Sequence, residues 1–195
     1  MITGYHVIFS TYGFWLPNDP RGSWSDFVGS WELFRYGRPT KTDERRSLAH
    51  RDHDRTLRHA AKRELKYPPL TFSGLQARAV ARGFAAYVAR TGLLVWACAI
   101  LPDHVHLVVG RVNMPVKRLV IQLKGAATRQ LEREGIHPLS EYRGAGERVP
   151  KCWVRGEWKV FLDADDVGRA VRYVEGNPLK EGKKKQGWGF VVRYL

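Results

Sequence analysis

The segment from Leu93 to Val109 constrains the fold most, because it predicts two strands in succession. Leu93 to Leu101 is almost continuously apolar, which is typical of a buried strand. Pro102-Asp103 then leads into a second strand, in which one valine separates His104 from His106. Side chains alternate between the two faces of a strand, so both histidines project from one side and the intervening apolar side chains from the other. The sequence therefore predicts a sheet that presents two imidazoles on one face.

The remaining periodic segments complete an alternating series of strands and helices. The first long helix has a single apolar stripe, and polar residues that can cap a helix precede two of the helices. The expected elements are a strand from Tyr5 to Thr11, a helix from Thr71 or Ser73 to about Arg90 that ends at Gly92, a helix that starts at Asn113 and Pro115, a strand from Trp153 to Leu162, and a last helix capped by Asp163.

The order β-α-β-β-α-β predicts an α+β fold, with a ferredoxin-like or RRM-like antiparallel sheet and two helices on one face. The third helix, which carries Tyr173, is left to cover the other face. At 195 residues the chain is long enough for one domain with an elaboration, and we expect a single domain over residues 1–195. The elaboration is an insertion at about residues 13–70, rich in proline, glycine and arginine, with a short helix around Asp54 to Leu65.

The charge balance indicates a polyanionic partner. The chain has 33 Lys and Arg against 19 Asp and Glu, which gives a net charge of +14. Basic side chains that neutralise phosphates release condensed counterions, so nucleic acid is the expected partner. A membrane surface is the competing polyanion, but no apolar run approaches the roughly 20 residues of a spanning helix, and the first residues do not resemble a signal peptide. We expect a cytoplasmic, nucleoid-associated protein in which Cys98 and Cys152 are reduced and structural.

The histidine pair is a candidate metal site, because imidazole is the commonest metal ligand in proteins and a strand orients both rings. The alternative is two partly exposed histidines on a solvated sheet face. His6, on the first strand, could face the same side, but we predict that it lies at the surface.

A second motif bears on this choice. It runs from Tyr173 through Asn177-Pro178 and Lys180 to Gly182, near the end of the chain. Together, Leu101-Pro102-Asp103-His104-Val105-His106-Leu107 and this Tyr-x-x-x-Asn-Pro-x-Lys-x-Gly motif resemble the two signatures of the single-tyrosine HUH transposases, specifically the REP-associated tyrosine transposases. The resemblance covers roughly residues 93–182. This chain has Trp158-Lys159-Val160 where many relatives place an acidic residue and a histidine.

The resemblance implies a metal-dependent enzyme that cleaves and rejoins single-stranded DNA near hairpins. Tyr173 would be the nucleophile and would form a 5′-phosphotyrosine. His104 and His106 would hold a divalent metal, Mg²⁺ or Mn²⁺, and Asn177 would complete the site because relatives carry a polar residue at this offset. The competing interpretation of Asn177 is a turn residue whose side chain bonds backbone groups, a common use of asparagine before proline.

Basic and aromatic side chains outside these motifs are candidates for contact with DNA. Lys117, Lys124 and Thr128 share one face of the second long helix, and a solvated basic surface is the alternative. The candidates are Lys117, Lys124, Thr128, Arg129, Arg78, Arg82, Arg51 and Arg55, with Trp15 as a ring that could stack on an unpaired base.

Two other functional classes remain open. One is a DNA- or RNA-binding regulator on the same fold, in which Tyr173 is merely packed. The other is a metal-dependent hydrolase with a water nucleophile, which forms no covalent adduct. For the transposase-like enzyme the expected partner is single-stranded or hairpin DNA, and the expected state is a monomer or a homodimer.

Overall fold

The chain folds into two compact units, Met1–Thr11 with Thr71–Leu195, and Tyr12–Leu70. The computed structural model describes residues 1–44 and 48–194. Within these residues no helix is both long enough and apolar enough to cross a membrane.

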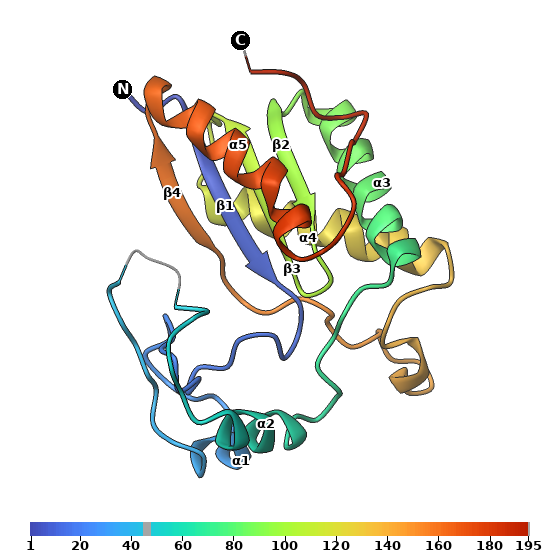
Figure 1. Ribbon diagram of the computed structural model, residues 1–195. Coiled ribbons are helices and arrows are strands. Elements are labelled where there is room, and N and C mark those ends of the chain that lie inside the picture. Colours follow the sequence, from blue (N-terminus) through green and yellow to red (C-terminus); the bar gives the residue numbers. More distant parts are fainter. Residues whose placement is uncertain (45–47, 195) are drawn as a thin grey trace. The chain divides into compact units, whose positions relative to one another are not determined.

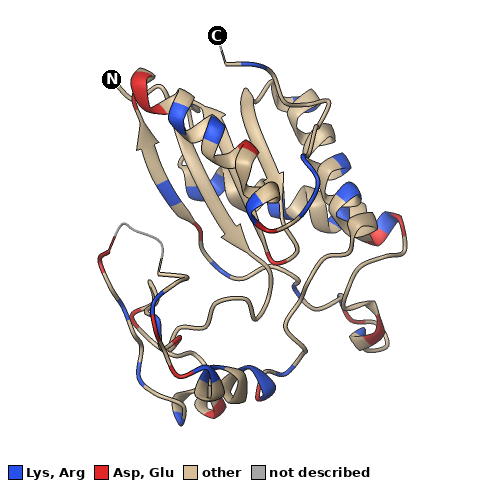
Figure 2. Ribbon diagram, in the orientation of Figure 1, with Lys and Arg blue, Asp and Glu red and all other residues tan. Residues whose placement is uncertain are grey.

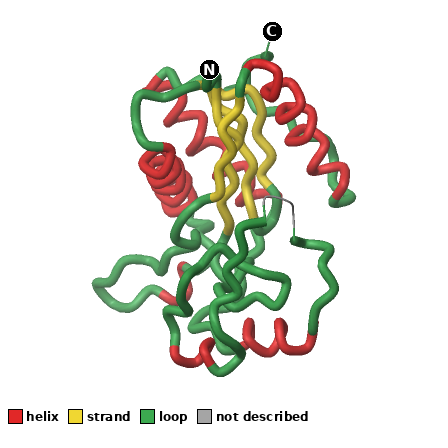
Figure 3. Tube along the Cα trace, turned by 90° about the vertical axis from the view of Figure 1, so that its left-hand side faces the viewer, coloured by secondary structure: helices red, strands yellow, loops and turns green. Residues whose placement is uncertain are grey.

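The first unit is built on a four-stranded antiparallel sheet (Figures 1 and 3). Its strands are β1 (Gly4–Ser10), β2 (Val95–Ile100), β3 (His104–Gly110) and β4 (Trp158–Leu162), in the order β2-β3-β1-β4. Helices α3 (Gly74–Thr91) and α4 (Val116–Arg133) pack together on one face, and α5 (Ala164–Lys180) lies on the other. A 3₁₀ turn, η1, spans Ser140–Tyr142. The predicted ferredoxin-like α+β fold with the tyrosine helix on the second face is confirmed.

Local sequence determines where the long helices begin and end. Ser73 accepts a hydrogen bond from the Gln76 amide, and the Gln76 side chain accepts one from the Ser73 amide, which together form a capping box. Gly92 ends α3 in the left-handed conformation at φ 66°. Asp163 caps α5 by accepting from the Asp166 amide.

Strand β4 is shorter than the sequence predicts. It begins at Trp158, and Trp153 forms only an isolated bridge with Thr11. Between the two, the carbonyls of Val154 and Gly156 accept hydrogen bonds from the Lys124 ammonium. Those backbone acceptors are therefore used by a side chain from α4 instead of a strand partner.

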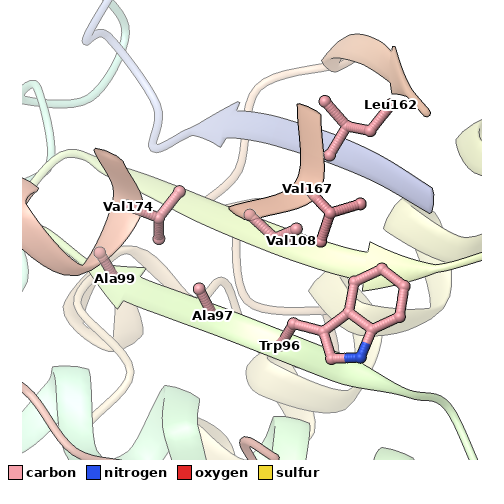
Figure 4. Packing of buried hydrophobic residues seen from close by; sticks show 7 residues of the cluster. All are labelled: Trp96, Ala97, Ala99, Val108, Leu162, Val167 and Val174. Atoms are coloured by element: carbon pink, nitrogen blue, oxygen red, sulfur yellow. The ribbon is translucent and has the colours of Figure 1, made fainter. Parts of the chain in front are cut away.

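Each face of the sheet carries its own apolar layer. On the α5 face, Figure 4 shows valines of the helix packed over small strand residues. This cluster comprises Trp96, Ala97, Ala99, Val108, Leu162, Val167 and Val174. On the other face α3 and α4 approach closely at Gly83, where an added Cβ would lie 2.7 Å from the Ala126 carbonyl oxygen. Only glycine allows this crossing, since any larger residue would push the backbones apart.

The tail after α5 covers the outer edge of β2. The Gln186 side chain accepts from the Ile100 amide and donates to the Ile100 carbonyl, both at 2.8 Å. The Val192 amide donates to the Val95 carbonyl at 2.9 Å. The tail thus satisfies outward-facing backbone groups of an end strand, which would otherwise be open to pairing with another chain.

The described residues of the second unit are mostly irregular and include two short helices, α1 (Trp31–Phe34) and α2 (Arg55–Arg63). The predicted helix around Asp54 to Leu65 is present as α2, capped by Asp54. A buried ion pair joins Arg21 to Asp19 through two contacts of 2.8 Å. The Arg21 guanidinium also lies over the Trp15 ring, 3.7 Å from its centroid.

Candidate metal and tyrosine site

The two motif histidines lie on the face of the sheet that α5 covers. Their ring centroids are 4.9 Å apart and their planes meet at 71°. In the register of the sheet His106 is opposite Ile8 of β1 and Ala99 of β2, so it lies between the two neighbouring strands. His106 is 4% exposed, whereas His104, at the start of β3, is half-buried.

Both histidines use the same ring nitrogen to contact the protein. His104 Nδ1 lies 2.7 Å from Asp103 Oδ1, and His106 Nδ1 lies 3.0 Å from His6 Nε2. Metal-bound histidines commonly use one ring nitrogen for the metal and bond a carboxylate or another acceptor through the other. The arrangement therefore assigns Nε2 of each ring as the nitrogen suited to a ligand.

His6 corrects the sequence prediction that placed it at the surface. It is 7% exposed and its ring stacks on that of His106, with centroids 5.3 Å apart. Burial lowers the pKa of His6 to about 4. Burial, followed by the nearby charge of His104, also holds the pKa of His106 well below its usual value. Both rings are neutral at neutral pH, which is the form of imidazole that binds metals.

Tyr173 lies beside these rings. Its ring centroid is 5.8 Å from the centroids of both His6 and His106, and both contacts are edge to face. The side chain is 45% exposed, so a large substrate can reach it. The Lys180 ammonium lies 4.5 Å from the centre of the Tyr173 ring.

Asn177 follows Tyr173 by four residues and lies on nearly the same face of α5. It does not turn the chain, because the helix continues through Pro178 to Lys180. Asn177 is 6% exposed, and its Nδ2 has no hydrogen-bond partner within the described part of the chain. Because Nδ2 is a hydrogen-bond donor, the unpaired group suits an acceptor and not a metal ion, which only the amide oxygen could bind.

Sequence reasoning missed two carboxylates at this site. Asp103 bonds His104, and Glu181 Oε1 lies 4.0 Å from His104 Nε2. Burial, with a contribution from the charge of Asp103, raises the pKa of Glu181. The available signal was the motif itself, since Glu181 lies between Tyr173 and Gly182 and directly follows the last residue of α5. Among the described residues, no three His, Cys, Asp or Glu side chains are arranged to hold a metal ion.

The residues that could hold a metal here are the two motif imidazoles, and Asn177 stays a predicted third ligand. Both imidazoles have their Nδ1 atoms engaged by the protein, and Asn177 is buried on α5, one helical turn beyond Tyr173. Such a set leaves several coordination positions for substrate oxygens and water.

Three of the residues predicted to contact DNA make hydrogen bonds within the protein. Lys124 is 9% exposed, and its ammonium donates to the carbonyls of Val154 and Gly156 at 2.9 and 2.6 Å. Thr128 donates to the Lys124 carbonyl one turn earlier. The Trp15 indole donates to the Gly22 carbonyl, and Arg21 covers one face of its ring. Burial corrects the assignment of Lys124, whereas Thr128 and Trp15 are half-buried and their contact with DNA stays a prediction.

The other basic candidates are exposed, and Figure 2 shows that basic residues are spread over several elements. Arg82 is paired with Glu134 across α3 and the end of α4, and Arg51 is paired with Glu44. The exposed candidates are Lys117, Arg129, Arg78, Arg82, Arg51 and Arg55.

No protein-family model matches this sequence, and no curated protein matches it. Two solved structures are similar to the chain. A candidate transposase from Deinococcus radiodurans R1 is 15% identical over 90% of this chain and 91% of that chain, with a TM-score of 0.46. A REP-associated tyrosine transposase bound to a REP hairpin is 11% identical over 95% of this chain and 73% of that chain, with a TM-score of 0.48. Because both scores lie below 0.5, the fold assignment rests on the strand order and register of this chain itself.

Proposed function

We propose that this chain is a transposase-like enzyme that cleaves and rejoins single-stranded DNA near hairpins through a 5′-phosphotyrosine on Tyr173. The observation that carries the proposal is the position of the Tyr173 ring, 5.8 Å from that of His106 on the sheet face shared with His104. The two motifs that resemble the single-tyrosine HUH transposases are thus brought together by the fold although 66 residues or more separate them in sequence.

Tyr173 is the nucleophile in this proposal. Its hydroxyl oxygen forms a bond to phosphorus, the bond from phosphorus to the 3′ oxygen breaks, and the strand leaves with a free 3′-hydroxyl. The phenol loses its proton and the leaving oxygen gains one. The Lys180 ammonium lies 4.5 Å from the ring centre, a cation–π contact that helps to hold the ring in place.

His104, His106 and Asn177 would hold a divalent metal through two imidazole nitrogens and one amide oxygen. When bound, such an ion would polarise the scissile phosphate and stabilise charge on the leaving oxygen. Two imidazoles favour Mn²⁺ over Mg²⁺, since magnesium prefers oxygen ligands. Asp103 and His6 contact the Nδ1 atoms of the two imidazoles, and α5 brings Tyr173 beside them.

The test uses a single-stranded hairpin DNA with Mn²⁺ and a denaturing gel. With a label at the 3′ end of the DNA, the label should migrate with the protein, whereas a 5′ label should be released on a shorter strand with a 3′-hydroxyl. Tyr173→Phe should bind DNA and keep its thermal stability but form no adduct. Tyr142→Phe, which changes another exposed tyrosine on η1, is the matched control. An adduct in the Tyr173→Phe protein would show that the nucleophile lies elsewhere.

The same gel separates the two alternatives. Cleavage without a protein-linked label indicates a water nucleophile, and binding without cleavage indicates a regulator. His104→Ala, His106→Ala or excess chelator should remove cleavage while most DNA affinity remains, because affinity comes mainly from dispersed basic side chains. Cleavage that persists in excess chelator would eliminate the metal from the proposal.

A further inference from the structure

A buried hydrogen bond joins His6 to His106, one of the two histidines predicted to bind a metal. In the sheet, His6 of β1 is opposite Val108 and Ile8 is opposite His106, so the two histidines are diagonal neighbours on adjacent strands. His6 Nε2 lies 3.0 Å from His106 Nδ1, and the two side chains are almost fully buried. The His6 ring is also held edge-on by Trp158 and Tyr173, at centroid distances of 5.5 and 5.8 Å.

One proton lies between the two nitrogens, and its position determines what His106 can do. If His6 donates it, neutral His106 carries its own proton on Nε2 and has no lone pair there for a metal. If His106 donates it, the lone pair of His106 Nε2 is available and His6 is protonated on Nδ1. Only the second arrangement is compatible with a metal ligand at His106.

His104 likewise contacts its partner through Nδ1, and that partner, Asp103, can only accept a hydrogen bond. An ionised carboxylate has no proton to give, so Asp103 accepts from His104 Nδ1 at 2.7 Å. Asp103 therefore selects the tautomer of His104 that has its lone pair on Nε2. His6 occupies the equivalent position beside His106 without adding a second negative charge to the site.

We propose that His6 is a positioning residue, which accepts the Nδ1 proton of His106 and thereby holds His106 in the tautomer that binds metal. This inference rests on the proposed function, because it explains how His106 would bind a metal. The proton between His6 and His106 can nevertheless be located in the protein without metal or DNA. With this role, strand β1 contributes a residue to the site that lies outside both sequence motifs.

The first test is the ¹⁵N spectrum of the histidine rings in the metal-free wild-type protein. Protonated and unprotonated ring nitrogens have distinct shifts, so the tautomer of His106 is read directly. We expect the proton on His106 Nδ1 and an unprotonated His6 Nε2. A proton on His106 Nε2 in the wild-type protein would overturn the proposal, and no variant has to fold for this result to be obtained.

The second test measures Mn²⁺ affinity by the loss of the free-ion EPR signal. His6→Phe keeps a ring but removes the acceptor, and loss of such an orienting partner typically weakens metal binding by about 10- to 100-fold. His6→Gln keeps an acceptor oxygen and should restore affinity to within a few fold of wild type. His59→Phe, an exposed histidine on α2, is the control for the same chemical change outside the site.

The outcomes separate this proposal from the proposed function. If wild-type protein forms the covalent adduct but His6→Phe binds Mn²⁺ as tightly as wild type, the role of His6 is refuted while the function stands. If wild type binds no Mn²⁺ and forms no adduct, the proposed function fails, and the ¹⁵N spectrum still decides the position of the proton. Equal loss of affinity in His6→Phe and His6→Gln would mean that packing, not proton acceptance, is what His6 supplies.

Discussion

Replacing Lys124 by methionine should change how the stability of the protein depends on pH. Methionine keeps the apolar stem of the side chain but removes the ammonium that bonds Val154 and Gly156. Burial lowers the pKa of Lys124 to about 8, from a value of 10.5 for an exposed lysine. The folded protein therefore releases this proton at a lower pH than the unfolded chain does.

The sign and size of the effect follow from proton linkage. Between pH 8 and 10.5 the unfolded chain binds a proton that the folded protein does not, so this residue makes the free energy of unfolding rise with pH. Each pH unit in this window contributes about 1.4 kcal/mol. Relative to Lys124→Met, the wild-type protein should therefore gain about 2 kcal/mol between pH 7 and pH 9.5.

Urea unfolding followed by circular dichroism at several pH values measures this difference, because other titrating groups are common to both proteins. Parallel stability profiles for wild type and Lys124→Met would refute the buried environment assigned to Lys124. Lys117→Met is the matched control, since Lys117 is exposed on the same helix and should leave the pH profile unchanged. In DNA binding, Lys117 and not Lys124 is the residue expected to matter. If Lys117 contacts a phosphate, its loss should reduce by about 1 the slope of the logarithm of the binding constant against the logarithm of the salt concentration, whereas loss of Lys124 should not change this slope.

Two further predictions concern packing. Gly83→Ala should lower the melting temperature by several degrees, because overpacking by a Cβ 2.7 Å from the Ala126 carbonyl oxygen typically costs about 1–3 kcal/mol and exceeds the helix propensity that is gained. Gly125→Ala, whose Cβ meets only the end of the Arg129 side chain, should not destabilise the protein, and both are measured by thermal melting. Burial raises the pKa of the Cys98 thiol, and that of Cys152 to about 11, so a thiol reagent monitored by absorbance at pH 8 should modify neither cysteine until urea unfolds the protein.

The features that sequence predicts well are those determined by local periodicity. The alternation of a strand places His104 and His106 on one face, and a separation of four residues places Tyr173 and Asn177 on one face of α5. The capping residues Ser73 and Asp163 and the terminating Gly92 also act on their immediate neighbours. Those elements and their order are sufficient to predict the fold.

The features that sequence misses depend on which segments become neighbours. His6 is in the site because β1 pairs with β3, about 100 residues away, and no local pattern specifies that pairing. Lys124 is buried because the backbone near Val154 folds over it, which also shortens β4. Lys124 lies on the same face of α4 as the exposed Lys117, so helical periodicity alone cannot predict which of the two lysines is buried.

The tail that covers the outer edge of β2 limits how this edge of the sheet can pair with a second molecule. On the β2 side, the Gln186 amide and the Val192 amide occupy hydrogen-bonding groups that a strand from a second molecule would need. Strand β4 is the end strand at the other side of the sheet order, and both of these tail contacts are made to β2. Loss of the tail would therefore expose backbone groups of β2 to pairing with a strand from another molecule, an edge-to-edge contact that the tail prevents.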